Sequence, residues 1–300
     1  GFKRQRQTDA SLIRIYFRYI CVQNRSMYTE YQPSHLLVPY IDSYWEFKGN
    51  PDYGMRIHIL PDGCTDFIFT LGEVANAVEE GSLIMQPYRS YFVGPMTKYS
   101  ELVTYTESIH MFGVRFLPCG LSCFTNLPLH EFVNSRVSTN EMKAVFDDTF
   151  IEKLGEQKHV TDRIRVVEEY LLAYLARHYQ PADSHVAMAV NMINHSKGKR
   201  SVRSLMDDVC LCQRHFERKF KHYTGFTPKE YSRIVKFKNA VELLRTTTSA
   251  NLLTTAVDAG YYDLAHFSKE IKSMSGNTPA SFLSLTVPEE TTLTYIEPQR

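Results

Sequence analysis

The sequence predicts an α+β protein of two domains, in which a β-rich barrel or sandwich with some helices precedes an all-helical domain. The chain has 300 residues, of which 43% are hydrophobic, so it is long enough and apolar enough to form two separate cores. Short aromatic and β-branched runs separated by turns occupy the first half, as in small barrels and sandwiches. Helical periodicity dominates the last hundred residues, and one pattern occurs there twice.

The N-terminal segment is expected to lie outside the fold. Its apolar stretch is interrupted by Arg14 and Arg18, which makes it a poor signal peptide. Residues 1–30 are interpreted as an extension, because Met27 could be a start residue. No run of eighteen apolar residues occurs in the chain, so we expect no transmembrane helix, no membrane partner and a cytoplasmic location.

The β-rich domain is expected at residues 31–158. Apolar and β-branched residues predict its strands, and Pro61-Asp62-Gly63 predicts a hairpin turn between the first two. An amphipathic pattern then predicts a linker helix within residues 159–182, whose apolar stripe over 161–179 either packs on the β-rich domain or forms a homodimer contact. The predicted strands cover residues 55–60, 65–71, 90–94, 101–105 and 110–116.

Charge is unevenly distributed along the chain. The formal net charge is +1, yet residues 195–245 hold 13 Lys and Arg against 5 Asp and Glu. A local basic block on a nearly neutral chain indicates a surface that binds a polyanion. The alternative is a solvated helical face with no partner.

Two segments of the last third repeat each other at an offset of 51 residues. His215-Phe216 recurs as His266-Phe267, Gly225 recurs as Gly276, and six of the fourteen positions from 215 to 228 are identical to their counterparts. Phenylalanines 216 and 220 share one helix face, and the following glycine suits a left-handed helix end. Thr227-Pro228 with Glu230 predicts a capping box that starts the next helix.

Each basic helix follows a shorter amphipathic helix, which makes the repeated unit a helix-turn-helix. In the second copy Gly260 provides the turn and Asp263 the cap. In the first copy, after a helix over about 201–208, Cys210 and Cys212 take these two places, so its turn is predicted to be the weaker one. One long helix over 228–245 joins the copies and would set two recognition helices about 34 Å apart.

These features resemble the DNA-binding domain of the AraC/XylS family. The stretch from Gly260 to Lys269, followed by Gly276-Asn277-Thr278-Pro279, carries the closest likeness, which covers residues 185–285. We therefore place the DNA-binding domain at 183–286 and a tail at 287–300. The resemblance implies base contacts by Gln213, Arg214, Glu217 and Arg218 in the first unit and by Leu264, Ala265, His266 and Lys269 in the second. It implies phosphate contacts by Lys221, Arg233, Lys236 and Lys272.

The N-terminal domain is similar to an uncharacterised sensor-type domain found before such DNA-binding domains. Leu60-Pro61-Asp62-Gly63-Cys64 and the stretch 113–120 carry that likeness. A small-molecule pocket is expected to be lined by Trp45, Arg56, Tyr91 and Arg115. The alternative is that the aromatic rings belong to the core and the arginines pair with carboxylates.

The expected function is sequence-specific regulation of transcription through double-stranded DNA, modulated by a small-molecule effector, with RNA polymerase and a second copy of the chain as further partners. No cofactor or metal is expected, and the protein is not expected to be an enzyme. The main alternative is a cysteine-based DNA alkyl-transfer protein, whose zinc site needs four suitably spaced cysteines that the six scattered ones do not supply. A protein that coats DNA without sequence preference is the third interpretation.

Overall fold

The N-terminal domain contains two antiparallel sheets that face each other. The computed structural model describes residues 27–78, 81–142, 145–146, 148–178, 180–246, 252–284 and 294–296. The larger sheet has the order β1-β2-β8-β4-β6-β9 and the smaller sheet the order β10-β3-β7-β5. The strands are β1 Tyr28–Tyr31, β2 Ile41–Gly49, β3 Met55–Ile59, β4 Thr65–Thr70, β5 Asn76–Ala77, β6 Ser90–Val93, β7 Ser100–Thr104, β8 Ile109–Phe116, β9 Arg136–Ser138 and β10 Thr294–Ile296.

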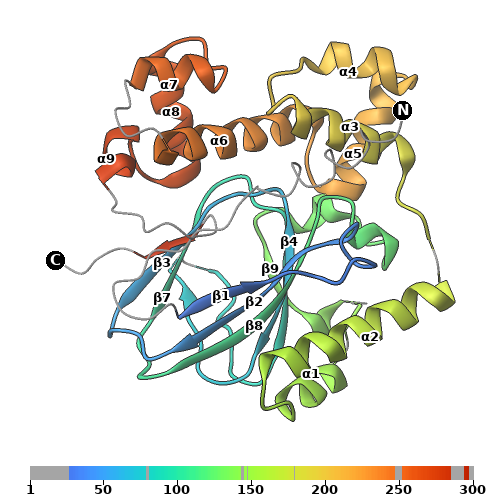
Figure 1. The fold of residues 1–300 in the computed structure, drawn as a ribbon, viewed down its shortest axis with the longest axis vertical. Helices are drawn as coiled ribbons and strands as arrows, with labels where there is room; N and C mark the ends of the chain where they lie inside the picture. The colour runs from blue at the N-terminus through green and yellow to red at the C-terminus, as the bar shows by residue number, and fades with distance from the viewer. Residues whose placement is uncertain are drawn as a thin grey trace, which may run out of the picture.

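Both faces of the larger sheet are buried, which explains why its strands are apolar on both sides. On β4, Phe67 and Phe69 point into a core shared with the helices α1 (Asp148–Gly155) and α2 (Val160–His178). Ile68, between them, points into a second core shared with the smaller sheet. Helices α1 and α2 therefore cover the outer face of the larger sheet (Figure 1).

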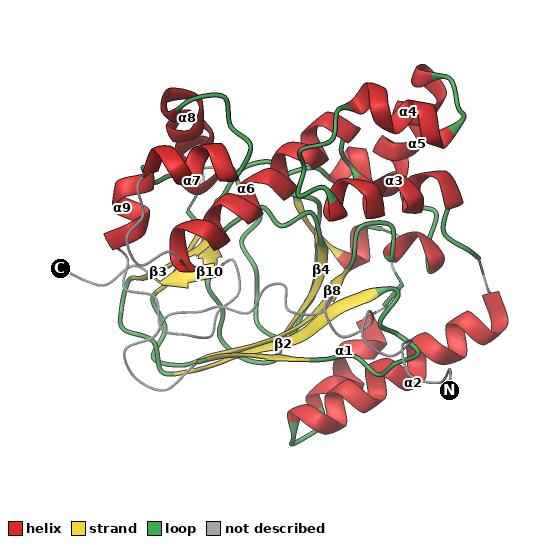
Figure 2. Ribbon diagram, turned by 45° about the horizontal axis from the view of Figure 1, so that its top comes forward, coloured by secondary structure: helices red, strands yellow, loops and turns green. Residues whose placement is uncertain are grey.

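The C-terminal domain is entirely helical and lies on one end of the β-rich domain. Helix α6 runs across this end, with α7 and α8 at one of its ends and α3, α4 and α5 at the other (Figures 1 and 2). The helices of the C-terminal domain are α3 Ser184–His195, α4 Val202–Val209, α5 Gln213–Thr224, α6 Pro228–Thr246, α7 Leu252–Asp258, α8 Leu264–Ser275 and α9 Pro279–Ser284.

Two predicted boundaries are wrong because both chain ends contribute strands. The predicted extension 1–30 includes most of β1, which pairs with β2 through Tyr28 opposite Phe47, and residues 1–26 lie outside the described residues. The predicted tail 287–300 includes β10, which pairs with β3. Short terminal strands are stabilised by the sheet edge they join, so local sequence pattern alone does not reveal them.

The predicted hairpin at Pro61-Asp62-Gly63 is also wrong. Strand β3 pairs with β7 and β10, whereas β4 pairs with β8 and β6, so the turn carries the chain from one sheet to the other. The turn is fixed by the helical domain: Leu60 is buried in the helical core, and Lys238 on α6 donates to the carbonyl oxygen of Asp62 at 3.0 Å. Tertiary packing thus decides the path of this turn.

The predicted linker helix belongs to the N-terminal domain. Val167 and Leu171 of α2 are fully buried in the core against the larger sheet, and Tyr170 donates to the carbonyl oxygen of Val145 at 2.7 Å. The chain reaches the helical domain only beyond α2, where Asp183 caps α3. None of the described helices combines the length and apolar character needed to cross a bilayer.

Candidate nucleic-acid interface

The two repeated segments fold as two helix-turn-helix units, α4–α5 and α7–α8. The turn in the second unit contains Gly260 with φ of +87°, a left-handed conformation that glycine adopts freely. In the first unit Cys210 takes the same left-handed conformation, with φ of +54°. A side chain at this position is strained, so the weaker first turn stays a prediction that this conformation supports.

The start of each recognition helix differs between the units in the predicted way. Asp263 caps α8, and its carboxylate accepts a hydrogen bond from the backbone N–H of His266 at 2.7 Å. Cys212 is the N-cap of α5 and makes no side-chain capping bond. The capping box that starts α6 is present, because Thr227 and Glu230 each accept from the other's backbone N–H.

The ends of the two recognition helices share a hydrogen-bond motif that residue identity did not reveal. Thr224 donates through its hydroxyl to the carbonyl of Phe220 at 2.7 Å, and Ser275, 51 residues later, donates to the carbonyl of Ile271 at 2.7 Å. Each hydroxyl also accepts from the backbone N–H two residues ahead, at 3.2 Å. Glycines with φ of +82° and +76° then close the two helices.

A single core holds both units together. Phe216 and Phe220 of α5, and Phe267 and Ile271 of α8, are fully buried in one cluster with the apolar side of α6. The opposite faces of α5 and α8 therefore stay available to solvent. Helix α6 packs against both units, as expected for a connector, and the predicted separation of about 34 Å stays a prediction.

The predicted base-contacting residues of α5 lie on its solvent side. Gln213, Arg214 and Arg218 are exposed. Glu217 is half-buried and accepts a hydrogen bond from Nε2 of Gln213 at 2.9 Å. This part of α5 offers guanidinium donors next to an amide–carboxylate pair, a combination that can hydrogen-bond to base edges.

The corresponding face of α8 is less polar. Leu264, Ala265, His266 and Lys269 are all exposed around its first turns. Leu264 and Ala265 offer only apolar contact, which suits thymine methyl groups rather than hydrogen-bonding base edges. The side chain of His266 lies against the ring of Tyr261, with ring centroids 5.4 Å apart.

Two of the four residues predicted to contact phosphates interact with other side chains of the protein. Lys221 and Lys272 are exposed at the ends of α5 and α8. Arg233 of α6 instead pairs with Glu270 of α8. Lys236 is half-buried above the ring of Tyr261, 5.6 Å from its centroid, and this burial lowers the pKa of the ammonium group.

Of the four residues predicted to line an effector pocket, two line a cavity and two lie away from it. A cavity of about 60 Å³ lies between the two sheets, and Trp45 and Arg115 line it. Tyr91 is buried and accepts from the backbone N–H of Gln86 at 2.6 Å, without lining this cavity. Arg56 is exposed and pairs with Glu101.

A network of charged groups forms the polar end of the cavity. Asp66 accepts from Nε1 of Trp45 at 2.7 Å and from Nε of Arg115 at 3.2 Å, and Nη1 of Arg115 also donates to Glu30 at 3.2 Å. Burial raises the pKa of Glu30 to about 7, although the Arg115 charge opposes this shift. Sequence reasoning missed Glu30 and Asp66, since strand pairing alone brings them to Arg115.

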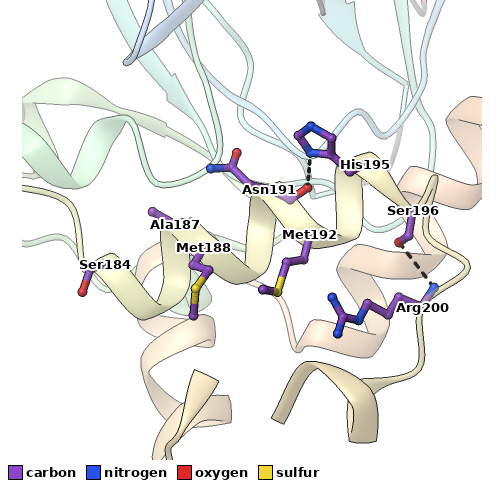
Figure 3. Close-up of a pocket in the computed structure, with 8 residues that line it drawn as sticks. All are labelled: Ser184, Ala187, Met188, Asn191, Met192, His195, Ser196 and Arg200. Carbon is purple, nitrogen blue, oxygen red and sulfur yellow. Dashed lines mark hydrogen bonds between the residues drawn. The ribbon is translucent and has the colours of Figure 1, made fainter. Parts of the chain in front are cut away.

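A shallow groove runs along α3 on the helical domain. Met188 and Met192 project from the same side of the helix, while Asn191 and His195 lie toward another side (Figure 3). Arg200 closes one end of the groove and donates from Nε to the hydroxyl of Ser204 at 3.0 Å.

Three of the five described cysteines are buried, and Cys210 and Cys212 in the first helix-turn-helix unit are exposed. Cys64, Cys119 and Cys123 are buried, and burial raises the pKa of all three thiols. A raised pKa disfavours the thiolate, which is the nucleophilic and metal-binding form. Within the described ranges, no three His, Cys, Asp or Glu residues gather in a group suited to a metal ion.

Comparison with known proteins separates the chain into two family regions. Residues 205–284 match the model of a helix-turn-helix domain, and residues 29–138 match a domain of unknown function, DUF6597. No curated protein matches the chain in sequence.

Several solved structures are similar to this chain. ToxT from Vibrio cholerae is 9% identical, with 81% of this chain and 98% of that chain covered and a TM-score of 0.48. ToxT bound to an unsaturated fatty acid is 12% identical, with 81% and 96% covered and a TM-score of 0.47. A probable AraC family transcriptional regulator from Rhodopseudomonas palustris is 20% identical, with 34% and 96% covered and a TM-score of 0.31.

The matched helix-turn-helix region coincides with the helices that form the two units, from within α4 to the end of α9. The DUF6597 region coincides with strands β1 to β9. The chain therefore combines an N-terminal DUF6597 domain with a C-terminal helix-turn-helix domain.

Proposed function

We propose that this chain is a transcription regulator of the AraC type and that it recognises a two-part DNA site by placing α5 and α8 in two successive major-groove segments on one face of the duplex. The observation that supports this most directly is that both helices expose one face while their other faces share a single core with α6. A rigid connector of this kind presents the two helices together, about one helical turn of DNA apart.

Base recognition is assigned mainly to the first unit. Arg214 and Arg218 are exposed donors that can hydrogen-bond to N7 and O6 of guanine. Glu217, which is hydrogen-bonded to Gln213, can accept from the N4 amino group of cytosine. The second unit offers Leu264, Ala265, His266 and Lys269, so we propose that it reads less sequence and more DNA shape.

Phosphate contacts are assigned to Lys221 and Lys272, whose ammonium groups are exposed. For Arg233 and Lys236 the present contacts favour another role. Arg233 links α6 to Glu270 of α8, and Lys236 covers Tyr261 in the turn of the second unit. We propose that both residues orient α8 rather than bind phosphate.

An effector is proposed to bind between the two sheets of the N-terminal domain. The cavity there has an apolar wall and a polar end with Trp45, Asp66 and Arg115. Its volume of about 60 Å³ is small compared with ligand sites of about 300–1,000 Å³, so an effector must spread the sheets to enter. Polar groups at one end and apolar side chains elsewhere favour a small amphiphilic molecule.

Two further partners are proposed from the regulatory role. RNA polymerase is the enzyme that a transcription regulator acts on, and a second copy of the chain is the other expected partner. The apolar stripe of α2 packs on its own domain, with Val167 and Leu171 fully buried, so a dimer formed through 161–179 would use the polar side of this helix. Light scattering of the chain with and without DNA measures this directly.

The DNA alkyl-transfer alternative is disfavoured by the thiols. Such chemistry needs an accessible thiolate, whereas the three cysteines of the N-terminal domain, Cys64, Cys119 and Cys123, are buried with raised pKa values. The exposed Cys210 and Cys212 lie in the first helix-turn-helix unit. Reaction of the folded chain with alkylated DNA, followed by mass measurement of the protein, would identify any alkyl group transferred from the DNA to a cysteine.

Selection of bound duplexes from a random pool tests the proposed function. The expected result is one enriched motif with two elements about 10 base pairs apart, the first more strongly specified than the second. The selected duplex should bind about a thousandfold more tightly than random DNA at the same salt concentration. A pool that stays random after repeated rounds would contradict sequence-specific recognition and favour non-specific coating.

A further inference from the structure

One loop of the N-terminal domain lies against the C-terminal ends of both recognition helices. It is the segment Gly94–Tyr99 between β6 and β7, here named the bridging loop. At Gly225, which ends α5, an added Cβ atom would lie 2.5 Å from Cγ of Pro95. At Gly276, which ends α8, an added Cβ atom would lie 2.8 Å from Cζ of Tyr99. The bridging loop thus touches equivalent positions of the repeat.

Hydrogen bonds tie the bridging loop to the segment that leads into β9. The N–H of Gly94 donates to the carbonyl of Ser135 at 3.0 Å, and the N–H of Asn134 donates to the carbonyl of Pro95 at 2.8 Å. The Asn134 side chain accepts from the N–H of Thr97 and donates to its hydroxyl, both at 2.8 Å. These bonds make the loop and the start of β9 one rigid piece.

Both ends of this piece meet the cavity between the sheets. Val93, directly before the bridging loop, lines the cavity. Arg136 also lines the cavity and donates from Nη2 to the hydroxyl of Ser100, directly after the loop, at 3.1 Å. A molecule that spreads the sheets therefore has to displace residues joined to the bridging loop.

A small rotation of a recognition helix about its C-terminal end displaces its first turn, where the proposed base contacts begin. A helix of 12 residues is about 18 Å long, so a rotation of about 5° moves its first turn by about 1.5 Å. Such a displacement exceeds the range of distances over which a hydrogen bond to a base edge keeps its strength.

We propose that the bridging loop is a positioning element of DNA recognition in addition to α6: it adjusts the angle of α5 and α8 through their C-terminal glycines and transmits the state of the cavity to both. This proposal rests on the proposed function, because it assumes recognition of a two-part site. Pro95 positions the first unit, Tyr99 positions the second, and Arg136 anchors the loop to the cavity wall.

The test compares full-length variants on two duplexes: the selected site, and the same site with two base pairs inserted between its elements. The insertion rotates the second element by roughly 70°. The variants are Tyr99→Ala, which removes the contact with α8, and Arg136→Met, which removes the anchor. Tyr99→Phe keeps the ring, and Tyr105→Ala is a matched control at an exposed tyrosine of the same domain. Thermal unfolding of each variant measures folding separately.

The wild-type chain, Tyr99→Phe and Tyr105→Ala should discriminate strongly against the inserted site. Tyr99→Ala and Arg136→Met should lower this discrimination by about tenfold, because the second unit can then adjust its angle. If the wild-type chain discriminates and either variant matches it, the proposal is overturned. If no site is selected in the first place, the proposed function itself fails.

Discussion

The guanidinium of Arg233 on α6 binds the carboxylate of Glu270 on α8 through two nitrogen atoms. Nη2 lies 2.9 Å from Oε1, and Nε lies 3.2 Å from Oε2. Planar geometry allows arginine to hold both oxygens, which lysine does not. This ion pair joins the connector helix directly to the second recognition helix.

Removing this pair should loosen the second unit. Glu270→Gln and Arg233→Lys are each expected to lower the free energy of unfolding by about 0.5–1 kcal/mol, since Arg233 is partly exposed to solvent. The double variant should lose less than the sum of the two, because both changes remove the same interaction. Chemical denaturation measures all three values, and strictly additive losses would show that the two groups do not interact in solution.

Replacing the strained cysteine in the first turn should stabilise the helical domain. Cys210 is exposed and has φ of +54°, so Cys210→Gly removes strain and loses little packing. We expect a gain of about 0.5–1 kcal/mol in the free energy of unfolding. Cys210→Ala is the control, because alanine keeps the strain. Equal stability of the glycine and alanine variants would contradict the assigned turn conformation.

Base and phosphate contacts should respond differently to alanine substitution. Arg218→Ala is expected to weaken binding to the selected site by about 1–3 kcal/mol and to relax one base preference. Lys272→Ala should weaken binding to all duplexes alike and lower the slope of log affinity against log salt by about one. Salt titrations on selected and shuffled duplexes separate the two effects. Identical behaviour of the two variants would remove the distinction between these roles.

The buried carboxyl of Glu30 should make stability depend on pH. Its pKa is raised to about 7 from an ordinary value of 4.5, so the folded state binds a proton that the unfolded state has already released between these values. Stability contributed by this group is fully present below pH 4.5 and falls as pH rises to about 7, by at most about 1.4 kcal/mol per pH unit.

Glu30→Gln should remove this part of the pH dependence. The difference in unfolding free energy between the wild-type chain and the variant is expected to change between pH 4.5 and 7 in the direction that favours the variant at higher pH. Denaturant titrations at several pH values provide the measurement. A difference that stays constant over this range would show that Glu30 titrates normally.

The repeat made most of the helical domain predictable from sequence. Glycine and aspartate at fixed offsets specify turns and caps through local chemistry, so the positions of Gly260, Asp263 and Gly276 follow from sequence alone. The hydroxyl motif at the helix ends was not found, because threonine at 224 and serine at 275 differ in identity while making the same hydrogen bonds.

The β-rich domain was less predictable, because its pairings depend on residues distant in sequence. The turn at Pro61-Asp62-Gly63 has the composition of a hairpin, yet contacts with Tyr231 and Lys238 of α6 direct it between the sheets. Strand β2 shows no simple alternation, because Tyr44 and Trp45 are buried in different cores of a sheet covered on both faces. The candidate pocket residues were only partly predictable for the same reason, since strand pairing decides which side chains reach the cavity. Trp45 and Arg115 line it, while Arg56 does not.

Joint presentation of α5 and α8 to one face of DNA is the central feature of the proposed recognition. The direct measurement is the affinity of the full chain for its selected site before and after insertion of five base pairs between the two elements. This insertion is about half a helical turn, so it moves the second element to the opposite face of the duplex. Affinity should fall to that for the first element alone. An affinity unchanged by the insertion would contradict simultaneous binding by the two helices.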